Sequence, residues 1–274
     1  MTDLGMKAEC LFCGSAGSFT TVEHIVPEAL GNDDLVLCGH VCDVCQAYFG
    51  KEIERYVLSK TPIGFWRAHL GIRGKEGKLA RVDLSVSEGR KGVLPEWSVH
   101  HDSGVAFSAH ADGTCSVEIS DREMLRQVLS GERRRFQFVF SPKSLVQIGR
   151  FLGKIGLELL CAGDPDLARH HQFDELRRYV RYGHRKEIWP IFHANKGTLE
   201  DLITREVERG ELVERVLCYD YGMHTDGEYW LFSFLTGIDF WVICMNDQFP
   251  TPEIREAYPD VDISLLWYPR ETWA

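Results

Sequence analysis

The chain has 274 residues, 44% of them hydrophobic, and a formal net charge of −10. A chain of this length and composition can bury a sizeable core, and we expect two units, a small one and a larger one. No stretch approaches the roughly 18 uninterrupted apolar residues of a membrane-spanning helix, and the N-terminus lacks the pattern of a secretory signal. These features argue against a membrane or secreted protein, and we expect a soluble protein of the cytoplasm.

The charge is unevenly distributed along the chain. Residues 191–274 carry a net charge of −10, whereas residues 121–190 carry +5. The basic residues of this middle segment include Arg133, Arg134, Arg135, Arg177, Arg178, Arg181, Arg185 and Lys186. A local positive face is sufficient for binding to a nucleic-acid backbone. The alternative is that these arginines lie on solvated helix faces, paired with Glu132, Asp174 and Glu175.

Two Cys-x-x-Cys pairs are the most informative feature of the sequence. They are Cys10 with Cys13 and Cys42 with Cys45, and 28 residues separate the two pairs. Such pairs supply the four soft ligands of a tetrahedral zinc. One alternative is a structural zinc with no chemistry attached, and a redox dithiol fits less well because no thioredoxin-like pattern surrounds either pair. Cys38 and His40 lie close to the second pair and are further candidate ligands.

Three segments around these cysteines carry a resemblance to a known family. They are Cys10-Leu11-Phe12-Cys13-Gly14, Glu23-His24-Ile25-Val26-Pro27-Glu28-Ala29-Leu30-Gly31 and Val41-Cys42-Asp43-Val44-Cys45-Gln46 with the following Gly50. In order and spacing they resemble the zinc-bearing HNH endonucleases of the ββα-metal fold. In that family an acid–His–hydrophobic–x–Pro motif ends the first strand of a hairpin, and a Cys-x-x-Cys-Asn motif begins the helix across it. The resemblance covers roughly residues 7–60.

The resemblance implies a catalytic centre beside the zinc. His24 would be the general base, and Glu23 would bind a divalent metal, Mg²⁺ or Mn²⁺, with Gln46 completing the site. Asn32 is the nearest counterpart of the middle Asn that usually orients the histidine. The zinc at the four cysteines would then be structural, and DNA would be the substrate, with RNA as the alternative.

Two positions depart from the family pattern. Glu23 stands where Asp is common, and Gln46 stands where Asn or His is usual, so each side chain is longer by one methylene. A metal site accommodates such changes only if it is enlarged, and otherwise the activity is lost. The alternative function is therefore a catalytically degenerate, HNH-derived zinc module that binds nucleic acid or a protein partner.

The remaining chain predicts an α+β protein with an HNH domain at 1–72 and an α+β accessory domain at 73–274. Thr61-Pro62 should end the first helix, and short strands should occupy 78–119. Ser141-Pro142 predicts a helix to Leu160, and a second helix is expected at 172–182. Strands are expected at 212–221, 229–235 and 238–245. Residues 144–183 resemble the accessory half found behind such HNH domains. A homo-oligomer or a protein partner could bind through the accessory domain.

Overall fold

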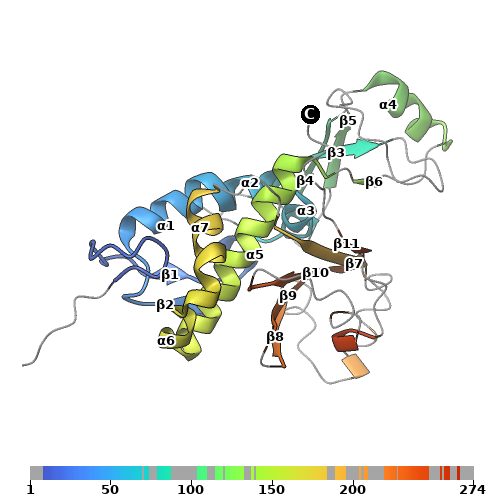
Figure 1. The fold of residues 1–274 in the computed structure, drawn as a ribbon. Helices are drawn as coiled ribbons and strands as arrows, with labels where there is room; N and C mark the ends of the chain where they lie inside the picture. The colour runs from blue at the N-terminus through green and yellow to red at the C-terminus, as the bar shows by residue number, and fades with distance from the viewer. Residues whose placement is uncertain are drawn as a thin grey trace, which may run out of the picture.

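The computed structural model describes residues 9–69, 71–73, 79–87, 104–109, 115–119, 121–132, 137–138, 140–183, 189–195, 204, 207–208, 219–226, 228–246, 254, 256–259 and 264–265. Helix α5 (Pro142–Gly163) crosses the middle of the molecule (Figure 1). The elements of residues 23–49 lie on one side of α5, and a sheet formed by later strands lies on the other. This helix therefore connects the parts of the chain that the sequence assigns to different domains.

The N-terminal part contains two short strands followed by a helix. Strand β1 (Glu23–His24) pairs antiparallel with β2 (Val36–Leu37), and the short helix η1 (Glu28–Leu30) lies between them in the chain. Helix α1 (Asp43–Phe49) continues through the π-helical segment η2 (Gly50–Glu54) into α2 (Arg55–Lys60). This order agrees with the expected strand–strand–helix arrangement, but two-residue strands do not by themselves show an HNH domain.

Helix α1 begins directly after Cys42, where the sequence predicts a helix start. Cys42 has an extended backbone, and Asp43 lies in the first turn, where a carboxylate is favoured by the helix dipole. Hydrogen bonds from Ser18, Thr21 and Thr20 hold the pKa of Asp43 well below its ordinary value. Asp43 therefore ties the loop after the first cysteine pair to the start of α1.

The expected end of the first helical stretch is confirmed, but a further helix follows at once. Thr61 is extended, and α3 (Pro62–His69) begins with the proline, whose missing N–H costs nothing at a first helical position. The close approach of the two helices requires Gly64, because a Cβ there would lie 2.4 Å from the carbonyl oxygen of Leu58. The pair Thr61-Pro62 is thus a corner between two packed helices.

Helix α5 starts as the sequence predicts. The Ser141 hydroxyl accepts a hydrogen bond from the Ser144 backbone N–H at 3.1 Å, which caps the first turn. A Cβ on Gly153 would lie 2.8 Å from both Leu176 and Val180 of α7 (Asp174–Tyr182), so glycine permits the close packing of α5 and α7. The short helices α6 (Pro165–Ala168) and η3 (His171–Phe173) connect the two.

The strands form two larger sheets, all with antiparallel pairing. One has the order β11-β7-β10-β9-β8 and the other β5-β4-β3-β6. The first contains β7 (Ile191–Asn195), β8 (Asp220–Thr225), β9 (Trp230–Thr236), β10 (Asp239–Cys244) and β11 (Ser264–Leu265). The second contains β3 (Arg81–Ser87), β4 (Gly104–Ala109), β5 (Cys115–Ile119) and β6 (Gln137–Phe138), with helix α4 (Arg122–Leu129) after β5. The predicted α+β class is confirmed.

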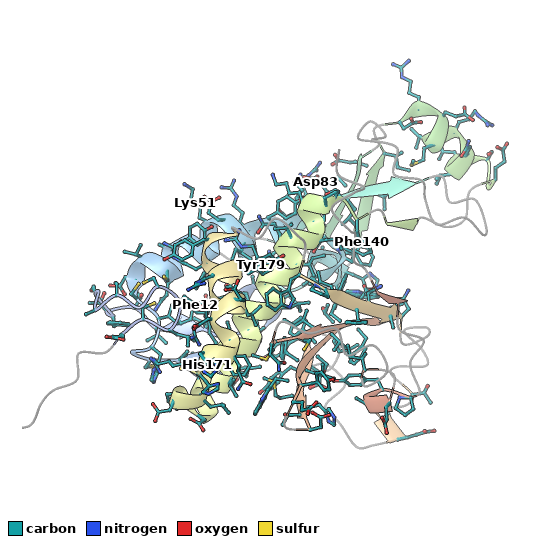
Figure 2. All side chains as sticks on the ribbon, in the orientation of Figure 1. Phe12, Lys51, Asp83, Phe140, His171 and Tyr179 are labelled. Carbon is teal, nitrogen blue, oxygen red and sulfur yellow. The ribbon has the colours of Figure 1, made fainter. Side chains whose placement is uncertain are left out.

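One hydrophobic core contains residues from both sides of the predicted boundary at 72/73. It joins the side chains around the four cysteines to those of α5, α7, β9 and β10. Phe12 and Tyr179 illustrate its two sides (Figure 2). Phe12 packs edge-on against Phe49 with ring centroids 4.7 Å apart, and the Tyr179 hydroxyl donates to the Val146 carbonyl at 3.1 Å.

No helix in the described parts of the chain is long and apolar enough to cross a membrane.

Several sequence predictions fall outside the described parts of the chain. They concern Arg133–Arg135, Arg185, Lys186 and the first residues of the strand expected at 212–221. Arg177 and Arg178 pair with Asp174 and Glu175 of their own helix. Arg178 is exposed, as the alternative of a solvated helix face anticipates, whereas the Arg177 side chain is only 12% exposed and donates to the carbonyls of residues 168–170.

Candidate functional site

The two cysteine pairs come together in one cluster. The sulfur atoms of Cys10, Cys13, Cys42 and Cys45 all lie within 4.8 Å of one another. The Cys13 and Cys42 sulfurs are 3.7 Å apart. Four sulfur ligands at this separation fit a metal ion such as zinc. A metal held by four protein ligands would have no coordination position left for a substrate.

The surroundings of the cluster favour a thiolate. The pKa of Cys10 is lowered to about 4, chiefly by the hydrogen bond with Cys45 and also by the backbone N–H of Cys42, whose nitrogen lies 3.4 Å from the Cys10 sulfur. The same sharing of a proton with Cys10 raises the pKa of Cys45. The cluster therefore holds at least one thiolate near neutral pH, which is the form that binds metal.

An arginine from α7 reaches this cluster from outside the predicted zinc module. Arg181 Nε donates a hydrogen bond to the Cys45 sulfur at 3.2 Å, and its guanidinium lies 4.2 Å from the centre of the Tyr48 ring. Arg150 of α5 donates to the Tyr48 hydroxyl at 2.6 Å. A hydrogen-bonded cation offsets part of the negative charge that four thiolates carry around a divalent ion.

Replacing Arg181 with alanine is expected to weaken zinc binding by roughly 10- to 100-fold, because the Cys45 sulfur loses its outer hydrogen bond. The dissociation constant would be measured by competition with a chromophoric chelator. Arg178→Ala is the matched control, since Arg178 lies on the same helix and pairs with the exposed Glu175. Equal zinc affinities for the two variants would contradict this role of Arg181.

His24 lies at the end of β1 and pairs with Glu28. Its Nε2 is 3.1 Å from Glu28 Oε1, and the two side chains are 26% and 34% exposed, so solvent reaches the pair. The turn at Pro27 and η1 brings Glu28 back toward the strand. Because a carboxylate only accepts, Nε2 of the neutral imidazole carries the proton and Nδ1 keeps the basic lone pair. Nδ1 is buried and has no hydrogen-bond partner in the described part of the chain.

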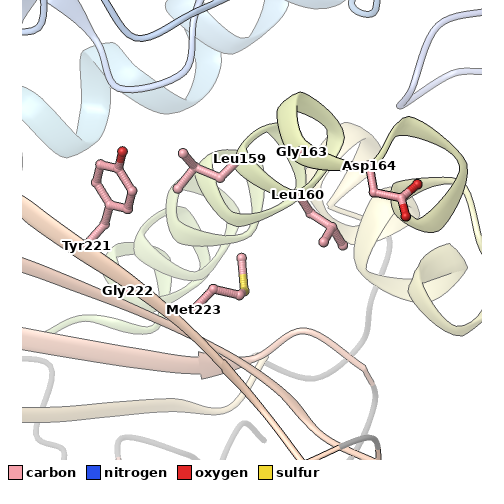
Figure 3. Close-up of a pocket in the computed structure, with 7 residues that line it drawn as sticks. All are labelled: Leu159, Leu160, Gly163, Asp164, Tyr221, Gly222 and Met223. Atoms are coloured by element: carbon pink, nitrogen blue, oxygen red, sulfur yellow. The ribbon is translucent and has the colours of Figure 1, made fainter.

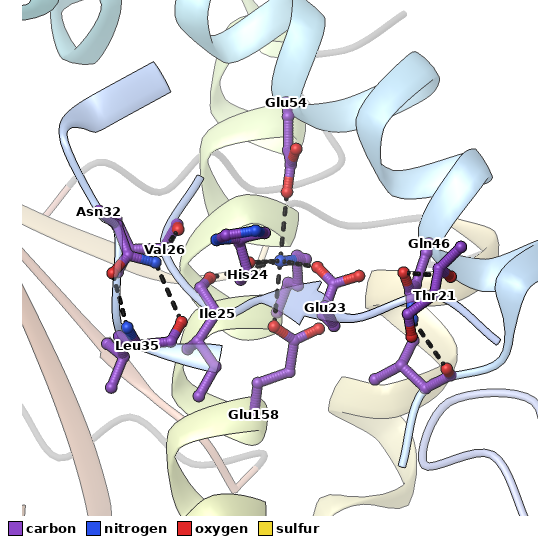
Figure 4. A network of polar contacts seen from close by, with 12 residues as sticks. Thr21, Glu23, His24, Ile25, Val26, Asn32, Leu35, Gln46, Glu54 and Glu158 are labelled. Carbon is purple, nitrogen blue, oxygen red and sulfur yellow. Dashed lines mark hydrogen bonds and ion pairs between the residues drawn. The ribbon is translucent and has the colours of Figure 1, made fainter. Parts of the chain in front are cut away.

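Glu23 points away from solvent toward a lysine of α5. Its side chain is 7% exposed, and Glu23 Oε1 lies 2.6 Å from Lys154 Nζ (Figure 4). The same ammonium lies 3.1 Å from Glu54 Oε1 and 3.0 Å from Glu158 Oε2, and it donates to the carbonyls of His24 and Ile25 at 3.1 and 3.3 Å. Lys154 is fully buried. The lysine thus lies among three carboxyl groups and two carbonyls.

Burial and charge act on this cluster in opposite directions. Burial raises the pKa of Glu23 in spite of the nearby Lys154, and it raises the pKa of Glu158 well above its ordinary range. Burial alone would lower the pKa of Lys154, but Glu158, Glu23 and Glu54 together raise it well above its usual value. The carboxyl groups therefore favour the charged ammonium, while burial favours the protonated form of Glu158, whose side chain is fully buried.

The Gln46 side chain binds the loop that precedes β1. Its Oε1 accepts from the Thr21 hydroxyl at 2.7 Å, and its Nε2 donates to the carbonyls of Thr21 and Val41 at 3.1 and 3.0 Å. These contacts are separate from those of Glu23 (Figure 4). The amide nitrogen therefore holds two backbone carbonyls, and the amide oxygen holds a side-chain hydroxyl.

Asn32 is fully buried and closes the connection between β1 and β2. Its Nδ2 donates to the carbonyls of Val26 and Leu35 at 2.6 and 3.0 Å, and its Oδ1 accepts from the Leu35 N–H at 2.8 Å. The Tyr219 hydroxyl approaches the same Oδ1 at 3.4 Å. Asn32 therefore shapes the loop after His24 through backbone contacts, and no hydrogen bond to the imidazole is present in the described structure.

The side chains in this arrangement do not fit the divalent metal that the resemblance implies at Glu23 and Gln46. Glu23 faces an ammonium, and Gln46 faces backbone carbonyls and a hydroxyl. Among the residues that the structure describes, the four cysteines are the one group of three or more His, Cys, Asp or Glu side chains close enough to share an ion.

The sequence did not predict a role for Lys154 or Glu158, although a charged pair four residues apart in an apolar helix is a usable signal.

The remaining candidate residues and a surface cavity lie elsewhere. Cys38 is exposed and outside the four-cysteine cluster, and His40 Nδ1 contacts Arg169 Nη2 at 3.2 Å. A cavity of about 410 Å³ opens between the end of α5 and strand β8 (Figure 3). It is lined by Leu159, Leu160, Gly163, Asp164, Tyr221, Gly222 and Met223. None of the predicted site residues lines it.

Comparison of the chain with family models, curated proteins and solved structures found no match. The resemblance to the HNH endonucleases stays a prediction. The chain's own residues supply a four-cysteine cluster that could hold a metal ion, a His–Glu pair and a buried lysine–carboxyl cluster.

Proposed function

We propose that the chain is an HNH-type phosphodiester hydrolase that cleaves DNA, with a structural zinc at the four cysteines. The observation that supports it is the position of His24 at the end of a short strand, with its imidazole held by Glu28 and exposed in part to solvent. A ring nitrogen positioned beside a carboxylate can act as a general base, and because Nδ1 is buried, the water would have to reach Nε2 beside Glu28, with the ring hydrogen on Nδ1. The cysteine cluster holds the start of α1 and the loop that leads to this strand.

The chain's own residues supply the following chemistry in this proposal. Glu28 fixes the ring of His24 and stabilises the imidazolium that forms when His24 takes a proton. Lys154 holds the carbonyl of His24 and thereby fixes the end of β1. No step is assigned to a second metal, because Glu23 and Gln46 are engaged in other contacts.

The test is cleavage of supercoiled plasmid, single-stranded DNA and RNA by the zinc-loaded protein, with and without Mg²⁺ or Mn²⁺. His24→Ala is expected to lower the cleavage rate by about 10²- to 10⁴-fold, the usual contribution of a general base. His170→Ala is the control, since His170 is an exposed histidine outside the site. Equal rates for wild type and His24→Ala would contradict the role of His24.

The second candidate function is a non-catalytic, HNH-derived zinc module that binds nucleic acid or a protein partner. The ion pair of Glu23 with Lys154 and the three hydrogen bonds of Gln46 favour it, because they occupy the groups that a metal-dependent hydrolase would use. A wild-type protein that holds one zinc per chain and cuts none of the three substrates would support this candidate and contradict the first.

A further inference from the structure

The surroundings of Lys154 Nζ have the chemistry of a hard-cation site. Five oxygen atoms lie within 3.3 Å of the nitrogen, from the carboxyls of Glu23, Glu54 and Glu158 and the carbonyls of His24 and Ile25. Carboxylate and carbonyl oxygens are also the ligands that Mg²⁺, Mn²⁺ and Ca²⁺ prefer. The cation at the centre of these oxygens is the ammonium group of Lys154.

We propose that Lys154 is the resident cation of the Glu23 site and that its ammonium excludes a divalent metal from this carboxylate. The inference concerns which cation neutralises Glu23, and it does not depend on whether the chain cleaves DNA. It replaces the Glu23-bound metal implied by the family resemblance with a residue 131 positions later in the chain.

The burial of Lys154 favours its ammonium over a metal ion as the cation next to Glu23. The Lys154 side chain is fully buried, so the ammonium has no access to water as an alternative partner. A second positive ion at Glu23 would have to enter a closed site and withstand the repulsion of the first. The exposed fractions of the Glu23 and Glu158 side chains are 7% and 0%, and Glu54, at 19%, is the most exposed of the three carboxyl groups.

Lys154 is also a positioning residue for the strand that carries His24. It holds that strand by three contacts, the Glu23 carboxylate and the carbonyls of His24 and Ile25. Glu158 lies one helical turn further along α5, and neither of its oxygens accepts a well-aligned hydrogen bond in the described structure, although Oε2 lies 3.0 Å from Nζ. The ammonium is therefore the partner on which this buried carboxyl group depends.

Binding of Mn²⁺ to the zinc-loaded protein, measured by electron paramagnetic resonance without nucleic acid, tests the proposal. Wild type and Glu23→Gln are expected to bind Mn²⁺ equally weakly. Lys154→Ala removes the resident cation and should bind Mn²⁺ at least about tenfold more tightly than wild type, and Lys154→Ala with Glu23→Gln should lose that gain. Lys154→Arg keeps a cation in place and should behave as wild type does.

Two results would overturn the proposal. One is a wild-type protein that binds one Mn²⁺ tightly and loses it in Glu23→Gln, which places the metal at Glu23 beside the lysine. The other is a Lys154→Ala variant that keeps its zinc and its circular dichroism but gains no affinity for Mn²⁺. The comparison of wild type with Glu23→Gln needs no change at Lys154, so it decides the question even where Lys154→Ala does not fold. A failure of the nuclease proposal leaves these measurements unaffected.

Discussion

Cys42→Ser is expected to abolish stoichiometric zinc binding and to unfold the N-terminal part of the chain. Cys42 has 1% of its surface exposed, belongs to the main core and immediately precedes α1. Binding of a structural zinc contributes an apparent free energy on the order of 10 kcal/mol, which is comparable to the whole free energy of unfolding of a typical domain. The loss of one of four ligands should therefore disorder the segment that these cysteines close.

Metal analysis of the purified protein and thermal unfolding followed by circular dichroism measure this effect. Cys38→Ser is the matched control, because Cys38 is exposed and stands outside the cluster. It should keep one zinc per chain and the wild-type Tm. A Cys42→Ser protein with unchanged zinc content and Tm would show that the cluster does not hold the fold.

The free energy of unfolding of Glu158→Gln, relative to that of wild type, is expected to increase as the pH rises above about 4.5. The fold raises the pKa of Glu158 because its carboxyl group is completely buried. A raised pKa means that the folded chain keeps a proton that the unfolded chain releases, so this contribution to stability is present at low pH and is lost as pH increases. The loss amounts to about 1.4 kcal/mol for each pH unit over which the folded carboxyl stays protonated.

Urea unfolding at pH 5, 6.5 and 8 measures this pH dependence. The free energy of unfolding of Glu158→Gln relative to wild type should increase from the lowest pH to the highest, because glutamine does not titrate. Glu175→Gln makes the same chemical change at an exposed position and should show no such trend. A constant difference between Glu158→Gln and wild type at all three pH values would rule out a retained proton on Glu158.

Local signals in the sequence were sufficient for much of the fold. The spacing of two Cys-x-x-Cys pairs predicted the four-cysteine cluster, since each tight turn fixes two sulfurs on one side. The cap at Ser141 and the proline after it predicted the start of α5, and Gly183 follows the end of α7 as expected. The aromatic and β-branched runs predicted β9 and β10. In each case the residues that decide the structure are neighbours in the chain.

The parts of the candidate site that escaped prediction depend on partners far away in sequence. Lys154 and His24 are 130 residues apart, and nothing near Lys154 indicates that it pairs with Glu23. Arg181 reaches Cys45 across 136 residues. Gln46 was expected to bind a metal, but its amide makes hydrogen bonds to Thr21 and Val41, a choice set by the path of the loop. Tertiary packing decides such contacts, and one sequence does not reveal it.

The long separation between Lys154 and His24 has a consequence for the order in which the chain folds during synthesis. The cysteine cluster closes over 35 residues, from Cys10 to Cys45, whereas the contact from His24 to Lys154 closes over 130. At about 5–20 residues per second, the ribosome needs roughly 6 to 26 seconds to proceed from His24 to Lys154. During that interval the nascent N-terminal segment can already hold its zinc, while Glu23 remains hydrated. The strand that carries His24 acquires its buried environment only after α5 has emerged.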